Sequence, residues 1–246
     1  MAVCSAFKGT ERGIAMQIKT IVGLALALAG CAANNQFSSE PRSVAIEADA
    51  QPAAAVLRPN MQNLLARTSP SYLTLTVNEA QKNTTTRGDD ILPRAVTSGS
   101  GFVISRTGYV ITAGHVAIKA GNTVEARSSD GRLYTGKVIA VQRFPDTALV
   151  RLRNFKGMPV SPARTPCLAD DSPVFSLGKP HAQSDTARIG NVKAQHFGRP
   201  VTYNGFGYPD AIVLSMNTRK GESGGPLFNQ GGQLSGMMVS TLSDGR

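Results

Sequence analysis

Residues 220–229 read KGESGGPLFN, and this glycine-rich stretch holds a single serine, Ser223. The pattern from Gly221 to Gly225 is G-x-S-x-G, which is found around nucleophilic serines in unrelated folds, so the order of the other polar residues decides the fold. In an α/β-hydrolase, an aspartate and a histidine follow the serine. No histidine follows Ser223 in this chain, which excludes that fold. Two interpretations of this stretch remain: a glycine-rich turn without catalytic function, and the nucleophile loop of a different fold.

A nucleophilic Ser223 would need partners upstream in the sequence. A serine hydroxyl is a weak nucleophile at neutral pH, so it needs a base, and the base needs a carboxylate to orient it. His115 lies in "GYVITAGHVA", where an apolar strand turns, and Asp146 opens the strand-like segment "DTALVRL". His181 and His196 have no such context, and we interpret both as structural or exposed. The resulting order, His then Asp then Ser, is that of chymotrypsin-type proteases.

The chain between residues 67 and 160 has the pattern of short β-strands. In "YLTLTVN" (72–78), Leu73, Leu75 and Val77 alternate with polar residues, as a half-buried strand requires. "SGSGFVIS" and "GYVITAG" flank a turn at residues 106–108, "NTVEARSSDGRLYTGKVIAV" contains two strands around a turn at 129–131, and "DTALVRL" adds another. The absence of a convincing long helix favours a barrel or sandwich over alternating strands and helices.

A second set of predicted strands occupies residues 161–246. It comprises "PVFSLGKP", "DTARIGNVKAQHFG", "DAIVLSM", "GPLFN" and "QLSGMMVS". The segment "NFKGMPVSPARTPCLADD" (154–171) separates the two sets, has three prolines and shows little periodicity, so the boundary falls there. We therefore expect an all-β protein with two domains.

Four motifs in this order, "SGSGFVIS", "TAGHV", "DTALVRL" and "GESGGPL", resemble the trypsin-like peptidase domain of the bacterial HtrA (Deg) family. The resemblance covers residues 70–242. It implies a chymotrypsin-like fold of two packed six-stranded antiparallel β-barrels with the active site between them. It also implies a serine endopeptidase that hydrolyses peptide bonds of proteins through an acyl-enzyme.

The resemblance assigns roles to the polar residues already singled out. Ser223 would attack the peptide carbonyl, His115 would take and return the proton, and Asp146 would orient His115 and stabilise its cation. The backbone N–H groups of Gly221 and Ser223 would form the oxyanion hole, and glycine suits that loop because a Cβ would resist its backbone angles.

The sequence departs from the family at two places. Glu222 precedes the serine where HtrA proteins usually carry asparagine, and its carboxylate would weaken the oxyanion hole unless Arg219 or Lys220 pairs with it. The chain also ends at "GMMVSTLSDGR", so we expect the second barrel to lack its last strand, either because the sequence is a fragment or because the protein is a reduced form. These departures motivate an alternative function, a catalytically weak or inactive protease-fold binding or sensor lipoprotein.

The substrate-binding residues are assigned by position in the resembling family. Asn217 and Thr218 would line the base of the pocket, and Val239, Ser240 and Thr241 would form the wall that pairs with the substrate chain. None of these side chains is charged, so we expect a preference for a small or medium apolar side chain. The partners implied are protein or peptide substrates.

The N-terminal residues 1–30 have the anatomy of a signal peptide that is removed. "MQIKTIVGLALALAGC" (16–31) has a positive charge at Lys19 and then a short apolar run, and Met16 is an alternative start. Leu28 to Cys31 resemble the lipobox of bacterial lipoproteins, which implies lipidation of Cys31 and anchoring to a membrane, although a buried helix ending in Gly-Cys is the other interpretation. By the same resemblance, the absence of aspartate at position 32, which is alanine, implies sorting to the outer membrane, facing the periplasm, if the cell has one. Residues 31–66 are predicted to be a flexible tether, within which Asn60 to Ala66 could begin a short helix.

Composition excludes several classes of function. The 41% hydrophobic and 17% charged residues are ordinary for a globular protein, and the net charge of +10 comes from scattered basic residues, so we expect no nucleic-acid binding. The three cysteines, Cys4, Cys31 and Cys167, and the three histidines lack metal-ligand spacing. We therefore expect neither a metal nor another cofactor, and the sequence leaves the oligomeric state open.

Overall fold

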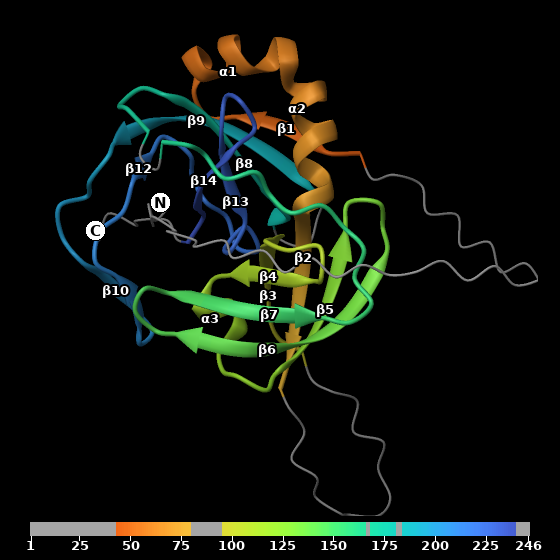
Figure 1. The fold of residues 1–246 in the computed structure, drawn as a ribbon. Coiled ribbons are helices and arrows are strands. Elements are labelled where there is room, and N and C mark those ends of the chain that lie inside the picture. The colour runs from red at the N-terminus through yellow and green to blue at the C-terminus, as the bar shows by residue number, and fades with distance from the viewer. Residues whose placement is uncertain (1–42, 80–94, 166–167, 181–183, 240–246) are drawn as a thin grey trace, which may run out of the picture.

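The computed structural model describes residues 43–79, 95–165, 168–180 and 184–239. Within these ranges the protein is mostly β, and its first half closes into a six-stranded antiparallel barrel in the order β2-β3-β4-β7-β6-β5 (Figure 1). The strands are β2 (Tyr72–Asn78), β3 (Ala95–Val103), β4 (Tyr109–Thr112), β5 (Thr123–Ser128), β6 (Leu133–Gln142) and β7 (Thr147–Leu152). Each falls within or overlaps a segment that the sequence predicted, and the first expected barrel is confirmed.

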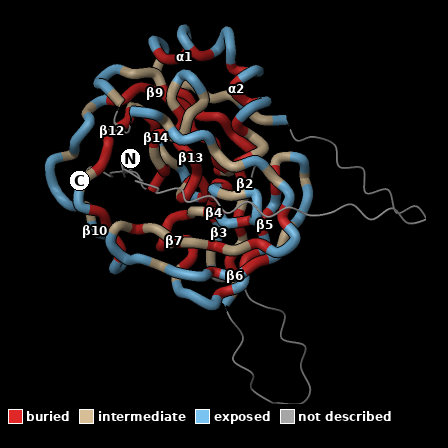
Figure 2. The backbone as a smooth tube through the Cα atoms, in the orientation of Figure 1, coloured by how far each residue is buried: buried red, intermediate tan, exposed pale blue. Residues whose placement is uncertain are grey.

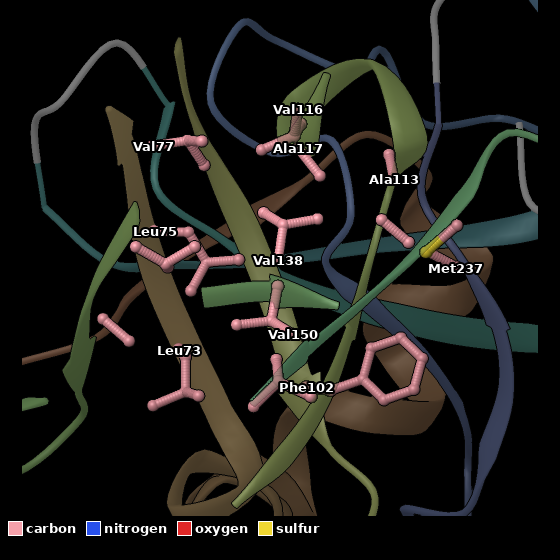
Figure 3. Close-up of a cluster of buried hydrophobic side chains, with 14 of the residues drawn as sticks. Leu73, Leu75, Val77, Phe102, Ala113, Val116, Ala117, Val138, Val150 and Met237 are labelled. Atoms are coloured by element: carbon pink, nitrogen blue, oxygen red, sulfur yellow. The ribbon is translucent and has the colours of Figure 1, made fainter. Parts of the chain in front are cut away.

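The alternation in β2 accounts for the barrel core. Leu73, Leu75 and Val77 are almost fully buried, whereas the threonines between them are only partly covered. Figure 3 shows these three side chains along one strand, with Val138 and Val150 from β6 and β7 facing them. Successive residues of a strand point to opposite faces, so the apolar set of every strand meets inside the closed ring.

Strands of the second half form a separate sheet together with the N-terminal strand β1, in the order β1-β9-β8-β13-β14, with β12 paired to β9. Its strands are β1 (Ala45–Ala48), β8 (Pro173–Gly178), β9 (Thr186–Ala194), β12 (Val213–Leu214), β13 (Pro226–Asn229) and β14 (Leu234–Met237). The short strands β10 (Val201–Tyr203) and β11 (Phe206–Tyr208) pair as a hairpin outside both sheets. Closure into a barrel is therefore established for the first half of the chain.

The segment from Ala45 to Thr68 is folded, which corrects the predicted tether over 31–66. β1 adds to β9 as a parallel strand, and α1 (Gln51–Leu57) and α2 (Met61–Thr68) follow, joined by a 3-10 turn over Arg58–Asn60. Ala53, Leu57, Met61 and Leu64 recur at helical spacing and are almost fully buried against the second sheet. The Ala, Gln and Asn around them hid this pattern. Residues 31–42, including Cys31, lie outside the described residues.

The two halves share buried surface where they meet. The core inside the barrel also contains Tyr208, Met237 and Val239 from the second half. A second core lies between α1, α2 and the sheet, and Figure 2 shows buried backbone through both halves. Among the described helices, none has the length and apolar character needed to span a bilayer.

Candidate active site

His115 and Asp146 are brought together at one edge of the barrel. His115 lies in the short helix α3 (Gly114–Ala117) that follows β4, and Asp146 lies just before β7, which pairs with β4. The His115 N–H donates to Asp146 Oδ1 at 2.8 Å, and His115 Nδ1 lies 2.6 Å from Asp146 Oδ2. The carboxylate is buried, whereas 19% of the His115 side chain is exposed. The Asp146 carboxylate therefore fixes the ring and leaves Nε2 as the nitrogen that can accept a proton.

The β10–β11 hairpin covers this pair. The Tyr203 hydroxyl donates to Asp146 Oδ2 at 3.4 Å, and its ring meets the His115 ring edge to face with centroids 5.1 Å apart. The Asp146 N–H donates to the carbonyl of Gly207 at 2.8 Å. Burial, together with the negative charge of Asp146, raises the pKa of Tyr203 well above its ordinary value, so the hydroxyl stays a donor. Tyr203 could not be singled out from the sequence, because nothing in its local pattern distinguishes it from an aromatic residue that only packs.

The Ser223 loop is bonded to barrel strand β3. The Ser100 N–H donates to the carbonyl of Ser223, and the Ser100 hydroxyl donates to the carbonyl of Gly221, both at 2.8 Å. Gly224 has a φ of +83°, and a Cβ at this position would lie 2.2 Å from the Ser100 carbonyl oxygen. The loop can approach the barrel this closely because residue 224 is glycine. The "SGSG" motif thus has a structural role beyond its strand.

The Ser223 hydroxyl donates to the carbonyl of Val239 at 3.1 Å. It makes no hydrogen bond to His115, which also lies within the described residues. Gly221 has a φ of +100°, in the left-handed region that glycine tolerates. Within the described part of the chain, no acceptor receives the N–H of Gly221 or of Ser223. Two neighbouring N–H groups are therefore available to a negatively charged oxygen.

Glu222 is buried, and its ion-pair partner differs from the one expected. Arg188 on β9 donates through Nη2 at 2.7 Å and through Nε at 3.1 Å to Glu222 Oε1. Arg219 donates only its backbone N–H, to Glu222 Oε2 at 2.6 Å, and Lys220 is exposed. Burial alone would lower the pKa of Arg188, but Glu222, followed by Asp49 and Glu47, raises it overall. The sequence signal was an arginine inside a strand whose neighbours are all apolar or small.

The predicted substrate-binding residues are only partly described. Asn217 is exposed and Thr218 is half-buried in the segment between β12 and β13, whereas Val239 is buried and offers its carbonyl to Ser223. Ser240 and Thr241 lie outside the described residues, as do Cys31 and His181. Cavities of about 250 and 490 Å³ occur elsewhere, beside Arg164 and beside Arg58.

His196 belongs to a second, exposed pair. Its Nδ1 lies 2.6 Å from Asp210 Oδ2, and 72% of the His196 side chain is exposed. The hydrogen bond from His196, together with backbone N–H donors, lowers the pKa of Asp210 to about 2. No described serine or other nucleophile hydrogen-bonds to His196. Among the described residues, no group of three His, Cys, Asp or Glu side chains could hold a metal ion.

Residues 99–237 match the family profile described as "Trypsin-like peptidase domain", which is more than half of the chain. The chain therefore belongs to the trypsin-like peptidase family. Within that family it carries an HtrA-like protease domain, because the curated proteins that it matches include HtrA, DegP-like and DegS serine proteases.

Two of these relatives show the extent of the similarity. "Serine endoprotease DegS" from Haemophilus influenzae is 29% identical and "Probable periplasmic serine endoprotease DegP-like" from Chlamydia trachomatis is also 29% identical. The alignments cover 60% and 61% of this chain. The chain spans only 42% and 29% of these relatives, respectively.

A solved structure supports the fold. The chain resembles a crystal structure of Rv3671c from M. tuberculosis H37Rv in an inactive form, with a TM-score of 0.59 and 24% identity. The match covers 78% of this chain and 82% of the other. At this identity the likeness concerns the fold alone.

Proposed function

We propose that this chain is a serine endopeptidase in which Ser223, His115 and Asp146 form the catalytic triad. The observation that carries the proposal is the pair of hydrogen bonds from His115 to the buried Asp146 carboxylate, at 2.6 and 2.8 Å. Such an arrangement serves a base that must be held in one tautomer and orientation. It occurs in a chain of the trypsin-like peptidase family with the Ser223 loop bonded to the same barrel.

The proposed reaction is acyl transfer in two steps. His115 Nε2 takes the proton of the Ser223 hydroxyl while the oxygen attacks the peptide carbonyl, and the N–H groups of Gly221 and Ser223 bind the oxyanion. His115 then gives the proton to the leaving amine, and water hydrolyses the acyl-enzyme. Before attack, the Ser223 hydroxyl must leave the carbonyl of Val239, which a rotation about its Cα–Cβ bond accomplishes.

The finer features of the proposal concern architecture and substrate. The second sheet would be the counterpart of the second chymotrypsin-like barrel, with the division between the two domains near residue 160. Asn217, Thr218, Val239, Ser240 and Thr241 would bind the substrate, with a preference for small or medium apolar side chains. Protein or peptide substrates are supported by the protease relatives.

Location in the bacterial cell envelope is part of the same proposal. A DegP-like relative is named as periplasmic, which supports this location. Anchoring by lipid on Cys31, after removal of residues 1–30, would hold the enzyme at the outer membrane. The observation in its favour is the lipobox-like sequence alone.

A second candidate function is a catalytically weak or inactive binding protein of the same fold. One observation favours it: the Ser223 hydroxyl donates to the carbonyl of Val239. Ser223 and His115 both lie within the described residues, and no hydrogen bond joins them. A serine held in this way is not activated by the base.

Labelling with a fluorophosphonate probe separates the two functions. The full chain is compared with Ser223→Ala and His115→Ala, and with Ser161→Ala as a matched control because Ser161 is exposed. Labelling of the parent chain and of the control, but of neither site variant, supports the endopeptidase. An unlabelled parent chain with an intact thermal transition contradicts it and supports the binding protein.

A further inference from the structure

The loop that carries Ser223 is tied to the N-terminal strand through one buried arginine. We infer that Arg188, held from its outer side by Glu47 and Asp49, is the positioning residue that sets the oxyanion hole through Glu222. This inference rests on the proposed serine endopeptidase activity. We call residues 219–223 the oxyanion loop.

The inner part of the arrangement fixes the oxyanion loop. Glu222 lies between Gly221 and Ser223, the two residues whose N–H groups would bind the oxyanion. Both carboxylate oxygens of Glu222 are engaged, Oε1 by the Arg188 guanidinium and Oε2 by the Arg219 N–H. The Arg188 and Glu222 side chains are 1% and 2% exposed. A carboxylate held at both oxygens in a closed space leaves the peptide groups on either side of it little freedom to rotate.

The outer part of the arrangement comes from β1. The parallel register places Glu47 beside Arg188, and Arg188 Nη1 lies 2.8 Å from Glu47 Oε2 and 3.4 Å from Asp49 Oδ2. Figure 1 shows β1 running along the edge of β9. The Arg188 guanidinium is therefore shared: Nε and Nη2 bind Glu222, and Nη1 binds Glu47 and Asp49.

Glu47 and Asp49 also hold the oxyanion loop and the segment just before it. Arg219 Nη1 lies 3.2 Å from Glu47 Oε2, and the Asn217 N–H donates to Asp49 Oδ2 at 3.1 Å. Each acidic residue thus contacts Arg188 on one side and the segment 217–219 on the other. Loss of both carboxylates would release this segment and leave Arg188 with Glu222 alone.

Charge balance explains why the outer acids matter to the loop. An arginine buried in a protein must be paired and hydrogen-bonded, because an unpaired buried charge is strongly unfavourable. Glu47 and Asp49 are partly exposed, at 35% and 22% of their side chains, so they compensate the Arg188 charge at the rim without being buried themselves. An ion pair between Arg188 and Glu47 would be enough to join β1 to β9, but Arg188 also binds Glu222 in the oxyanion loop. The loop is the element that the network constrains.

The test compares two double variants of the full chain. Glu47→Gln with Asp49→Asn removes the outer acids, and Glu125→Gln with Asp170→Asn makes the same charge change at exposed positions. The measurements are kcat and KM for fluorescein-labelled casein, affinity for a peptide boronate with valine at its reactive end, and the thermal midpoint. The boronate bonds to the Ser223 oxygen, passes the hydroxyl proton to His115 and places an oxygen in the oxyanion hole.

We expect the outer-acid variant to lose 10- to 100-fold in both kcat and boronate affinity, on the order of one oxyanion donor or somewhat less. KM is expected to rise as well, because the released segment carries the proposed substrate-binding residues Asn217 and Thr218. The fall in kcat at saturating substrate is therefore the readout of the oxyanion contact, which is made only in the transition state. The control variant should match the parent chain. Arg188→Lys, which keeps the charge but loses the fork, should be at least as impaired, and the outer-acid variant alone carries the test if Arg188→Lys does not fold.

Three outcomes overturn the inference, and only the last also overturns the proposed endopeptidase activity. If the parent chain is labelled by fluorophosphonate but the outer-acid variant keeps parental kcat and boronate affinity, Arg188 and its acids are not positioning residues, and the proposed endopeptidase stands. A fall in thermal midpoint without any change in kcat leads to the same conclusion. If the parent chain itself is not labelled, the proposed function fails and the inference fails with it.

Discussion

The barrel and the second sheet each supply part of the candidate site, but they support it by different means. His115 and Asp146 lie at the edge of a barrel filled with apolar side chains, and Ala113 and Val116, close to His115 in sequence, belong to this buried core. Ser223 lies on a loop in which the preceding residue, Glu222, forms an ion pair with the buried Arg188. One half relies on packing and the other on a network of charges.

This difference has a physical consequence for what each half can tolerate. Apolar packing is non-directional, so it stabilises the barrel without defining the orientation of any single peptide group. A buried ion pair contributes little net stability because desolvation offsets the attraction, but its geometry is directional. We therefore expect changes in the barrel core to reduce stability, and changes in the Arg188 network to reduce catalysis.

The largest expected effect tests the contact between His115 and Asp146, which lies on the barrel side of the candidate site. Asp146→Asn keeps the shape of the side chain but cannot hold His115 in the required tautomer, so kcat should fall by about 10⁴-fold, as in the trypsin-type triad from which this figure comes. Steady-state hydrolysis of labelled casein measures it. Asp170→Asn, at an exposed position, is the control. A loss below tenfold would mean that Asp146 does not orient the base.

The second prediction concerns the packing of the barrel. Leu75→Ala removes a fully buried side chain that faces Val138 and Val150, and it should lower the free energy of unfolding by about 3 kcal/mol. Urea denaturation measures the change, and Leu133→Ala, at a position with 59% exposure, is the matched control. The remaining folded protein should keep its kcat. A large loss of kcat in the folded Leu75→Ala protein would remove the distinction between the two halves.

The sequence predicted the barrel and the candidate triad more completely than the surroundings of Ser223. Alternating residues such as Leu73, Leu75 and Val77 specify a strand and its buried face locally, and the other barrel strands followed from short strand-like segments and the turns between them. His115 and Asp146 were found because each stands at a strand end within a short motif, and the structure brings them to hydrogen-bonding distance. Their catalytic roles stay a proposal.

Pairings between distant residues could not be predicted in the same way. Arg188 is 34 residues from Glu222 and 141 residues from Glu47, so no local spacing indicates that they meet. A neighbour in sequence, Arg219 or Lys220, was therefore the natural expectation for Glu222. The helix α1 escaped prediction for a related reason, since its apolar face consists mostly of alanine, which favours no particular packing partner. The short helix expected to begin within Asn60 to Ala66 corresponds to α2.

A smaller effect on kcat is expected from a change in the β10–β11 hairpin, which covers His115 and Asp146. Tyr203→Phe keeps the edge-to-face contact with His115 but removes the 3.4 Å hydrogen bond to Asp146. Because this bond is long, we expect a fall in kcat of about three- to tenfold, the equivalent of one modest hydrogen bond. Tyr109→Phe, on the barrel surface, serves as the control. An unchanged kcat would show that the β10–β11 hairpin shields the dyad by packing alone.

The smallest effect tests a charge pair at the surface, as a contrast with the buried pair of Arg188. The pKa of Asp210 is lowered to about 2 from an ordinary value of 3.8, first by the hydrogen bond from His196 and also by the N–H groups of Phe197, Gly198 and Ala211. A lowered folded-state pKa means that this carboxylate stabilises the fold above about pH 4 and that the contribution is lost as the pH falls toward 2.

Asp210→Asn should therefore lower stability by a few tenths of a kcal/mol at neutral pH, since the pair is largely exposed, and remove the difference from the parent chain near pH 2. Chemical denaturation across this pH range measures it, and His196→Ala separates the ring from the backbone donors. If Asp210→Asn instead destabilised the chain as strongly as Leu75→Ala, exposed charges would contribute as much as packing. Burial would then not explain why ion pairs and apolar packing contribute differently to stability.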